Sequence, residues 1–327
     1  MTHTAAGCEY VADDLEIGTG SYDVSTYGEA TVLVTDYLEG RLTAVFEKWP
    51  ERATLMLSGG IDSILIATVV ARLRPDSLAL TFSQEGDDKA TKEAETAAAV
   101  AQQLGLEHQI VEPDSSQLEK LLTETVCKLG TSEPWEVLAG VVLLAINHAA
   151  QQSNANGPII SGGGADALFL GGADFETTRF NDMSEVVAQW DKRVRAKIES
   201  NFTRKRFIPD FYERLLNDPD RHIQVWQTEA AVRLAQRLHP QVVRGDNLLR
   251  DKDLFRRMAV EAGLAESVVA LDKNPMQVSS GGLNGIVRLA RQEMNEKFGA
   301  RTYSDPLVEP LDFTVSRLWL SSLENGD

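Results

Sequence analysis

Short apolar runs alternate with longer amphipathic segments over the first half of the chain. The short runs have the length and composition of buried strands, whereas the longer segments carry apolar residues three and four positions apart, which is typical of helices. The expected strands are residues 54–57, 77–82, 108–111 and 158–161, and the expected helices are residues 30–49, 62–74, 90–104, 115–129 and 136–152. Strands that alternate with helices predict an α/β fold with a parallel sheet and right-handed crossovers.

The pattern changes near residue 174, where helical spacing continues but clear strands stop. The residues before position 30 are polar and rich in Gly, Ser and Thr, and they predict either short strands or an arm with little order. We therefore expect an N-terminal arm over residues 1–29, an α/β domain over residues 30–173 and a helical region over residues 174–327 packed on it. The helices expected in the last region are residues 184–199, 209–216, 223–238, 252–262, 284–297 and 313–323.

The hexapeptide Ser-Gly-Gly-Ile-Asp-Ser joins the first expected strand to a helix. Gly59 and Gly60 let backbone N–H groups approach phosphate oxygens, and the helix macrodipole favours negative charge there. Ser58 and Ser63 add hydroxyl donors. The carboxylate of Asp62 cannot donate a hydrogen bond to a phosphate at neutral pH, so we expect it to act through Mg²⁺. The turn lacks the Gly-Lys-Ser/Thr ending of a Walker A loop, and an ordinary turn of small residues is the simpler alternative.

A second glycine turn follows the last expected strand, at residues 161–172. It repeats the first arrangement, a strand, a turn of glycines and then an aspartate, here Asp166. A flexible linker is the alternative, but the apolar residues 168–170 argue against a solvated linker. Ligands of parallel sheets bind beyond the carboxyl ends of the strands. Asp62 and Asp166 are therefore candidates to share one or two Mg²⁺ ions.

These two turns carry a resemblance to a known family. The hexapeptide matches the pyrophosphate loop of the N-type ATP pyrophosphatases, and the second turn resembles the segment Ser-Gly-Glu-Gly-(Ser/Ala)-Asp-Glu-Leu-Phe-Gly-Gly of asparagine synthetases. Residues 264–277 and the glycines at 281–282 resemble a late segment of the same family, and β-lactam synthetase is also similar. The resemblance covers roughly residues 30–300. It implies a doubly wound parallel sheet of the adenine nucleotide α-hydrolase (HUP) type, with the nucleotide-binding domain in residues 30–173.

The resemblance also implies roles for individual residues. Lys273 resembles the synthetase lysine that acts on the leaving pyrophosphate or the adenylate, and Asp166 matches a catalytic and metal-binding position. Arg250, Lys252, Arg256 and Arg257 are further candidate cations, but their helical spacing favours a solvated face. The residues expected to bind ATP are Leu57, Ser58, Gly59, Gly60, Asp62, Ser63, Thr81, Phe82, Ser83, Gly162 and Gly163, of which Leu57, Thr81, Phe82 and Ser83 would adjoin the adenine.

The sequence departs from the family pattern in three places. Gly163 replaces the glutamate that the family links to the incoming ammonia, and Ala167 replaces a second acidic residue. Thr2 stands where glutamine-hydrolysing members have a cysteine, so we expect no glutaminase domain here. Trp135 and Glu136, with the nearby Glu133, fall near the expected mouth of the site. One of the two carboxylates is a candidate to accept a proton from an amine.

These observations predict an ATP-dependent amide-forming ligase in a specialised biosynthetic pathway. It would adenylate a carboxylate, release pyrophosphate and pass the acyl group to ammonia or an amine, with ATP and Mg²⁺ as cofactors. Sulfur insertion or base modification by another ATP pyrophosphatase, and a non-catalytic ATP-binding homologue, are the alternatives. A separate glutaminase, a carrier partner and a homodimer are left open.

Composition narrows the class of partner. The 327 residues carry a formal net charge of −17, with 49 acidic against 32 basic residues, which makes a nucleic-acid backbone an unfavourable partner. The chain has 2 cysteines, so the sequence indicates neither a disulfide framework nor a zinc set. No signal peptide or membrane segment is expected, and we predict a cytoplasmic protein that acts on small molecules.

Overall fold

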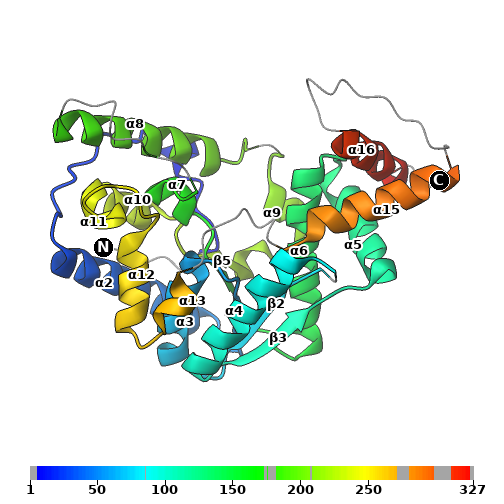
Figure 1. Cartoon of the computed structure of the whole chain (residues 1–327), viewed down its shortest axis with the longest axis horizontal. Coiled ribbons are helices and arrows are strands. Elements are labelled where there is room, and N and C mark those ends of the chain that lie inside the picture. Colours follow the sequence, from blue (N-terminus) through cyan, green and yellow to red (C-terminus); the bar gives the residue numbers. More distant parts are fainter. Residues whose placement is uncertain are drawn as a thin grey trace.

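The computed structural model describes residues 6–84, 86–172, 175, 182–206, 208–270, 280–297 and 311–324. Its centre is one sheet of five parallel strands in the order β3-β2-β1-β4-β5 (Figure 1). The strands are β1 (Thr54–Met56), β2 (Leu78–Phe82), β3 (Glu107–Val111), β4 (Ile159–Ser161) and β5 (His222–Gln224).

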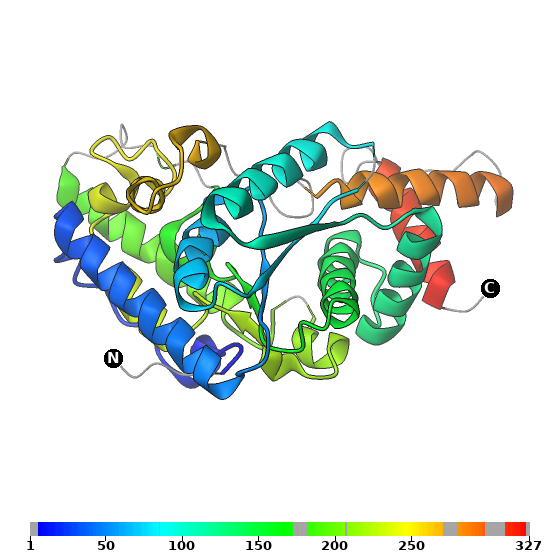
Figure 2. The same ribbon diagram turned by 90° about the horizontal axis from the view of Figure 1, so that it is seen from below.

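Helices cover both faces of the sheet (Figure 2). Helices α3 (Ile61–Leu73) and α4 (Asp88–Leu104) connect β1 to β2 and β2 to β3, and they pack into one hydrophobic core. Helices α5 (Ser115–Leu129) and α6 (Pro134–Gln152) connect β3 to β4 and belong to a second core on the opposite face. Residues of one strand alternate between the cores, as Ile159 and Ile160 do in β4. The expected doubly wound parallel sheet is confirmed.

Local sequence signals set the ends of the crossover helices. Asp87 caps α4 by accepting hydrogen bonds from the backbone N–H groups of Lys89 and Ala90. Asp114 and Gln117 form a reciprocal capping box at the start of α5. Both helices end at a glycine with positive φ, a conformation that L side chains rarely adopt.

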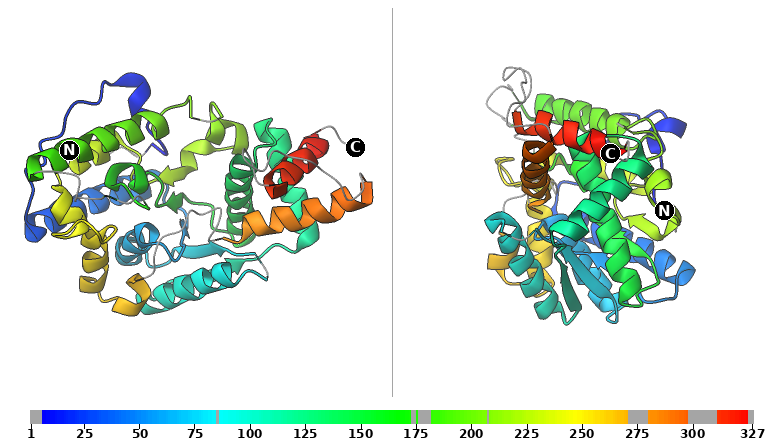
Figure 3. Two further views of the ribbon diagram at one scale, coloured as in Figure 1. Left: turned by 45° about the horizontal axis from the view of Figure 1, so that its top comes forward. Right: turned by 90° about the vertical axis from the view of Figure 1, so that its right-hand side faces the viewer.

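The second half of the chain flanks the sheet with helices (Figure 3). Helix α12 packs on α3 beside the long helix α2 (Tyr27–Lys48), while α15 and α16 pack on α5 and α6. Helix α8 lies along the opposite border of the molecule from α4 in Figure 1. The remaining helices are α1 (Val11–Asp14), α7 (Ala165–Phe169), α8 (Met183–Asn201), α9 (Phe211–Leu215), α10 (Glu229–Ala235), α11 (Pro240–Arg244), α12 (Asp253–Glu261), α13 (Glu266–Val269), α15 (Gly282–Lys297), α16 (Leu311–Glu324) and the 3₁₀ turn Pro219–Arg221.

The helix expected at residues 223–238 is wrong at its start. Residues 222–224 form strand β5 and not the beginning of a helix, and α10 begins only at Glu229. Strand β5 pairs with β4 in parallel, with His222 opposite Ile159. Pairing with β4 determines this short strand. Three residues are too few to show the alternating pattern by which a strand is predicted from sequence.

The N-terminal arm packs against the second half of the chain. Val11, Tyr22 and Val24 are buried in the first core, and Val24 forms a parallel bridge with Leu238. The backbone N–H of Gln224 donates to the carbonyl of Gly7 at 2.9 Å. Residues 173 and 174, where the sequence places a boundary between two parts, lie outside the described residues.

Among the described helices, none is by itself long and apolar enough to cross a bilayer. Helices α5 and α6 meet the criterion only as a pair, and they are bent by 113° at the break between them.

Candidate functional site

The two glycine turns meet at the point where the strand order reverses. Strand β2 lies on one side of β1 and β4 lies on the other, so the turns that follow β1 and β4 emerge side by side. Gly162 has little room for a side chain, because an ideal Cβ there would lie 3.1 Å from Cβ of Asp62 and 3.2 Å from the backbone N of Ser63. The glycine therefore lets the second turn touch the first.

The first turn presents a helix N-terminus with its donors in place. Gly60 occupies the N-cap position of α3, and no described side chain caps this end. The hydroxyl of Ser58 accepts from the backbone N–H of Gly60 at 3.2 Å and lies 3.0 Å from the hydroxyl of Ser63. A thirteen-residue helix whose first-turn N–H groups lack a side-chain cap is a suitable anion site, and two hydroxyls lie beside it.

Lys252 joins the two turns. Its Nζ lies 2.6 Å from Oδ1 and from Oδ2 of Asp62 and 2.6 Å from Oδ1 of Asp166. The Lys252 side chain is 0% exposed, and that of Asp62 is 7% exposed. A buried ammonium needs such paired carboxylates, because dehydration of an unpaired charge is very costly. The expectation that Lys252 belongs to a solvated face is therefore wrong.

The backbone around Lys252 is held in an unusual geometry. Lys252 has φ of 49°, in the left-handed region, directly before α12. Arg256 is also buried and not solvated as expected, and its Nε donates to the carbonyl of Asp251 at 2.9 Å. A further bond from Arg256 to the carbonyl of Val269 ties α12 to α13. Gly171 completes the support, because any side chain there would collide with Asp166 and Lys252.

The structure brings the two expected metal ligands together. Asp62 and Asp166 share one cation, which here is the ammonium of Lys252. Among the described residues no group of three or more His, Cys, Asp and Glu side chains forms a complete metal site. Two carboxylates nevertheless fit Mg²⁺, which binds oxygen ligands and fills its shell with water and substrate phosphates.

The residues expected near adenine lie at the adjacent ends of β1 and β2. Leu57, Thr81, Phe82 and Ser83 are all buried, and the hydroxyl of Thr81 donates to the carbonyl of Leu57 at 2.5 Å. Thr81 also contacts Nε2 of His108 at 2.8 Å, and burial lowers the pKa of this histidine. The side chains of these four residues are buried in the protein interior, and their contact with adenine stays a prediction. Lys273, the other expected catalytic residue, lies outside the described residues.

Gln224 fills the space beside Gly163. An ideal Cβ at position 163 would lie 2.7 Å from Oε1 of Gln224. Gln224 is 3% exposed, and its Nε2 has no hydrogen-bond partner among the residues that the structure describes. A neutral amide from β5 thus stands where the resembling family carries a glutamate on the turn itself. Sequence reasoning missed Gln224 because β5 was not expected.

A cavity of about 90 Å³ lies between the N-terminus of α6, the end of α8, α9 and the N-terminal arm. Trp135 and Glu136 line it, as expected for residues near the mouth, whereas Glu133 is outside the lining and pairs with Arg317 at 2.9 Å. The other lining residues are Tyr10, Ala139, Asn201, Thr203, Arg204, Arg206, Ile208, Asp210, Phe211, Tyr212 and Gln227.

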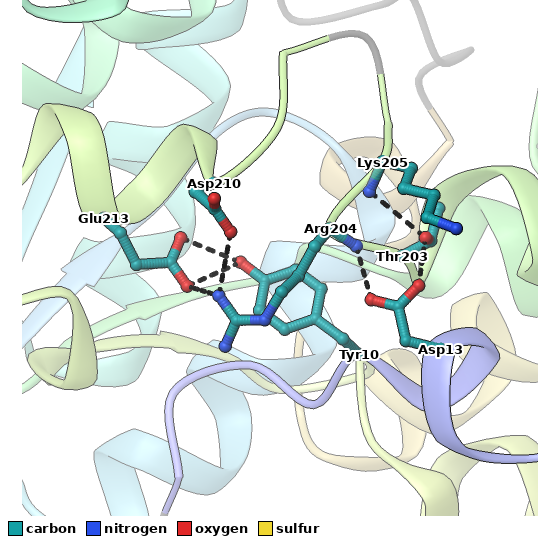
Figure 4. A network of polar contacts seen from close by, with 7 residues as sticks. All are labelled: Tyr10, Asp13, Thr203, Arg204, Lys205, Asp210 and Glu213. Atoms are coloured by element: carbon teal, nitrogen blue, oxygen red, sulfur yellow. Dashed lines mark hydrogen bonds and ion pairs between the residues drawn. The ribbon is translucent and has the colours of Figure 1, made fainter.

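A polar network fixes one wall of this cavity (Figure 4). Arg204 pairs with Asp210 at 3.1 Å and with Glu213, and its guanidinium lies 4.1 Å from the ring centroid of Tyr10. The hydroxyl of Tyr10 donates to Glu213 at 3.1 Å, and the backbone N–H of Arg204 donates to Asp13 at 2.9 Å. The network ties the N-terminal arm to the segment between α8 and α9.

Comparison with known proteins gives one family. The family model described as asparagine synthase matches residues 51–270, which include both glycine turns, Lys252 and β5. A search of the curated proteins finds no match. Among solved structures, the NMN synthetase from Francisella tularensis is similar at 14% sequence identity and a TM-score of 0.34, over 76% of this chain and 98% of that chain.

Proposed function

Since the chain belongs to the asparagine synthase family, which uses ATP, we propose that it is an ATP-dependent amide-forming ligase. In this proposal it adenylates a carboxylic acid, releases pyrophosphate and transfers the acyl group to ammonia or an amine, leaving AMP. The observation that carries the proposal is Lys252, a buried cation held at 2.6 Å from Asp62 and Asp166 where the two glycine turns meet.

The first step is attack of a substrate carboxylate oxygen on the α-phosphorus of ATP. The bond from that phosphorus to the oxygen bridging it to the β-phosphorus breaks, and negative charge builds on the departing pyrophosphate. Ser58, Ser63 and the first-turn N–H groups of α3 would bind this charge, and the ammonium of Lys252 would neutralise part of it. Groups placed in advance where charge develops stabilise the transition state more than the ground state.

Asp62 and Asp166 would hold Mg²⁺ when the nucleotide is bound. The ion would neutralise phosphate charge and orient the triphosphate for cleavage after its first phosphorus. Lys252 already balances part of the charge of the two carboxylates without it. The protein therefore keeps them close together before any ligand arrives.

In the second step the nitrogen nucleophile attacks the acyl carbon and AMP leaves with the bonding electron pair. The nitrogen loses a proton as the amide forms. The neutral amide of Gln224 lies beside Gly163 with Oε1 nearest the turn, and it would hydrogen-bond the acyl group or the nucleophile. Gln224 is uncharged, whereas family members carry a glutamate on this turn. The difference fits a nitrogen nucleophile other than the one those members use.

Sulfur chemistry, the alternative suggested by the wider ATP pyrophosphatase group, has less support. Burial raises the pKa of Cys8 to about 12, which keeps its thiol protonated and poorly nucleophilic at neutral pH. Cys127, the other cysteine, is exposed on α5. Cys8 accepts a hydrogen bond from Nε2 of Gln227 at 2.8 Å, and no described hydrogen bond joins either cysteine to the two glycine turns.

Exchange of labelled pyrophosphate into ATP tests the proposal. A panel of small carboxylic acids, each with ATP and Mg²⁺, should contain at least one that supports exchange without any added amine, because adenylation is reversible before nitrogen attack. Binding of ATP without exchange for every acid would instead favour a non-catalytic homologue. The variant Ser63→Ala should slow exchange by roughly 10-fold or more through loss of a hydroxyl beside the phosphates.

A further inference from the structure

Glu136 is a half-buried carboxylate in the wall of the 90 Å³ cavity, which Arg206 also lines. It lies in the first turn of α6, and no ion pair or hydrogen bond of its side chain occurs within the described part of the chain. By contrast, Arg204 and Asp210 in the same wall pair with each other at 3.1 Å. Burial raises the pKa of Glu136, while the nearby positive charge of Arg206 opposes this rise. A half-buried carboxylate that makes no hydrogen bond or ion pair with the described residues gains from a cation brought by a ligand.

The rest of the wall suits an organic cation. Four aromatic residues line the cavity, namely Tyr10, Trp135, Phe211 and Tyr212. The face of Tyr10 already carries the guanidinium of Arg204 at 4.1 Å from its ring centroid. Aromatic rings around one carboxylate bind both the apolar body and the charged group of an amine. The volume of about 90 Å³ is several times the ~10–15 Å³ that one water needs, so a body larger than ammonia fits.

One residue that lines the cavity packs against the second glycine turn. Gln227 lines the cavity, and its backbone N would lie 2.8 Å from an ideal Cβ on Gly164. The backbone N–H of Trp226 donates to the carbonyl of Gly163 at 3.2 Å. The cavity is therefore a neighbour of the turn that carries Asp166, and residues 226 and 227 contact that turn.

We propose that this cavity binds a compact primary amine, as its ammonium ion, with Glu136 as the counter-ion. The inference rests on the proposed function, in which the bound ammonium ion passes one proton to the carboxylate of Glu136 and the resulting neutral amine is the nitrogen nucleophile. It narrows the nucleophile from ammonia in general to an amine with an apolar body.

Binding of probe amines to the full chain tests the assignment. Isobutylamine, a cation at neutral pH, and isobutanol, its neutral counterpart, are titrated by saturation-transfer NMR at pH 7.5. The amine should bind more tightly than the alcohol, and Glu136→Gln should weaken amine binding at least about 10-fold without affecting the alcohol. Glu133→Gln is the matched control, since Glu133 pairs with Arg317 outside the cavity, and it should change amine binding much less than Glu136→Gln does.

A second variant guards against an indirect effect of the charge change. Ala139→Leu fills the cavity without altering its charge, and it should reduce binding of both probes, with thermal unfolding showing that each variant is folded. Equal amine affinity of Glu136→Gln and the wild type, or equal affinity for amine and alcohol, overturns the assignment.

The proposed function and the cavity assignment fail in different experiments. Absence of carboxylate-dependent pyrophosphate exchange in the wild type removes the ligase function but leaves amine binding through Glu136 as measured. If the wild type catalyses exchange normally but Glu136→Gln binds the amine as tightly as the wild type, the cavity assignment is wrong and the proposed function stands. In a functioning ligase, Glu136→Gln should retain exchange and lose transfer to the amine, because exchange precedes nitrogen attack.

Discussion

At the scale of single residues, Lys252 has the most unusual environment in the site. Its ammonium is wholly buried, two carboxylates surround it and its backbone has a positive φ of 49°. Each feature costs free energy by itself, and the pairing with Asp62 and Asp166 offsets the loss of hydration. Glycine at 171 leaves room for both Asp166 and the lysine. The free-energy cost of burying Lys252 in this backbone conformation is consistent with a functional role for its ammonium in ligand binding.

Replacement of Lys252 should impair stability and exchange together. Lys252→Gln leaves Asp62 buried without its counter-ion, so we expect a loss of about 2–4 kcal/mol in the free energy of unfolding. Exchange should fall at least about 100-fold, because the variant lacks the cation that we propose neutralises charge on the leaving pyrophosphate. Urea unfolding and the exchange assay measure the two effects. Lys120→Gln, an exposed lysine on α5, should leave both near wild type, and a fully active Lys252→Gln enzyme would refute the role.

The sequence predicts residues whose signal is local. The glycine turns were recognisable because strand, glycines and aspartate follow one another within a few positions. Lys252 lies 190 residues from Asp62 and 86 from Asp166, and its neighbourhood has the helical spacing of an ordinary charged face. Only the packing of α12 on α3 brings the lysine into the site. Tertiary placement of this kind has no local pattern.

At the scale of elements, β5 extends the sheet beyond β4 and contributes to the site. It places Gln224 beside Gly163 and buries His222 opposite Ile159. Its three residues are His, Ile and Gln, all buried, so polar residues occupy core positions and hide the strand in the sequence. The ring of His222 stacks on Tyr212 at 5.4 Å, and its Nδ1 has no hydrogen-bond partner within the described residues. Burial lowers the pKa of His222 to about 4.

This histidine should make the fold sensitive to acid. Below its unfolded pKa of about 6.5, the unfolded chain binds a proton that the buried ring resists until pH approaches 4. Stability is therefore intact above pH 6.5 and falls between pH 6.5 and 4, by about 2–3 kcal/mol at pH 4.5 from this group. His222→Gln should flatten that part of the curve of unfolding free energy against pH, as measured by urea titration. An unchanged slope in the variant would contradict the assignment.

At the scale of the whole molecule, two cores and one reversal of strand order create the site. The strands and crossover helices of the first half follow from periodicity, since buried parallel strands and amphipathic helices have strong patterns. The helical second half follows from the sequence as well, apart from β5. The sequence does not predict how the second half of the chain packs on the first half. Helix α12, strand β5 and the N-terminal arm make these contacts between segments that are distant in the sequence. The two glycine turns are predictable from the sequence because their signal is local, whereas of the 90 Å³ cavity only the part near Trp135 and Glu136 is predictable.

The products of ATP turnover test the central claim most directly. With an acid that supports exchange and a competent amine, phosphorus NMR should show AMP and pyrophosphate in equal amounts, because the proposed site would bind the β- and γ-phosphates and release them as one group. Lys252→Gln should form neither product above background. Formation of ADP and orthophosphate by the wild type, in proportion to the amide, would contradict the account.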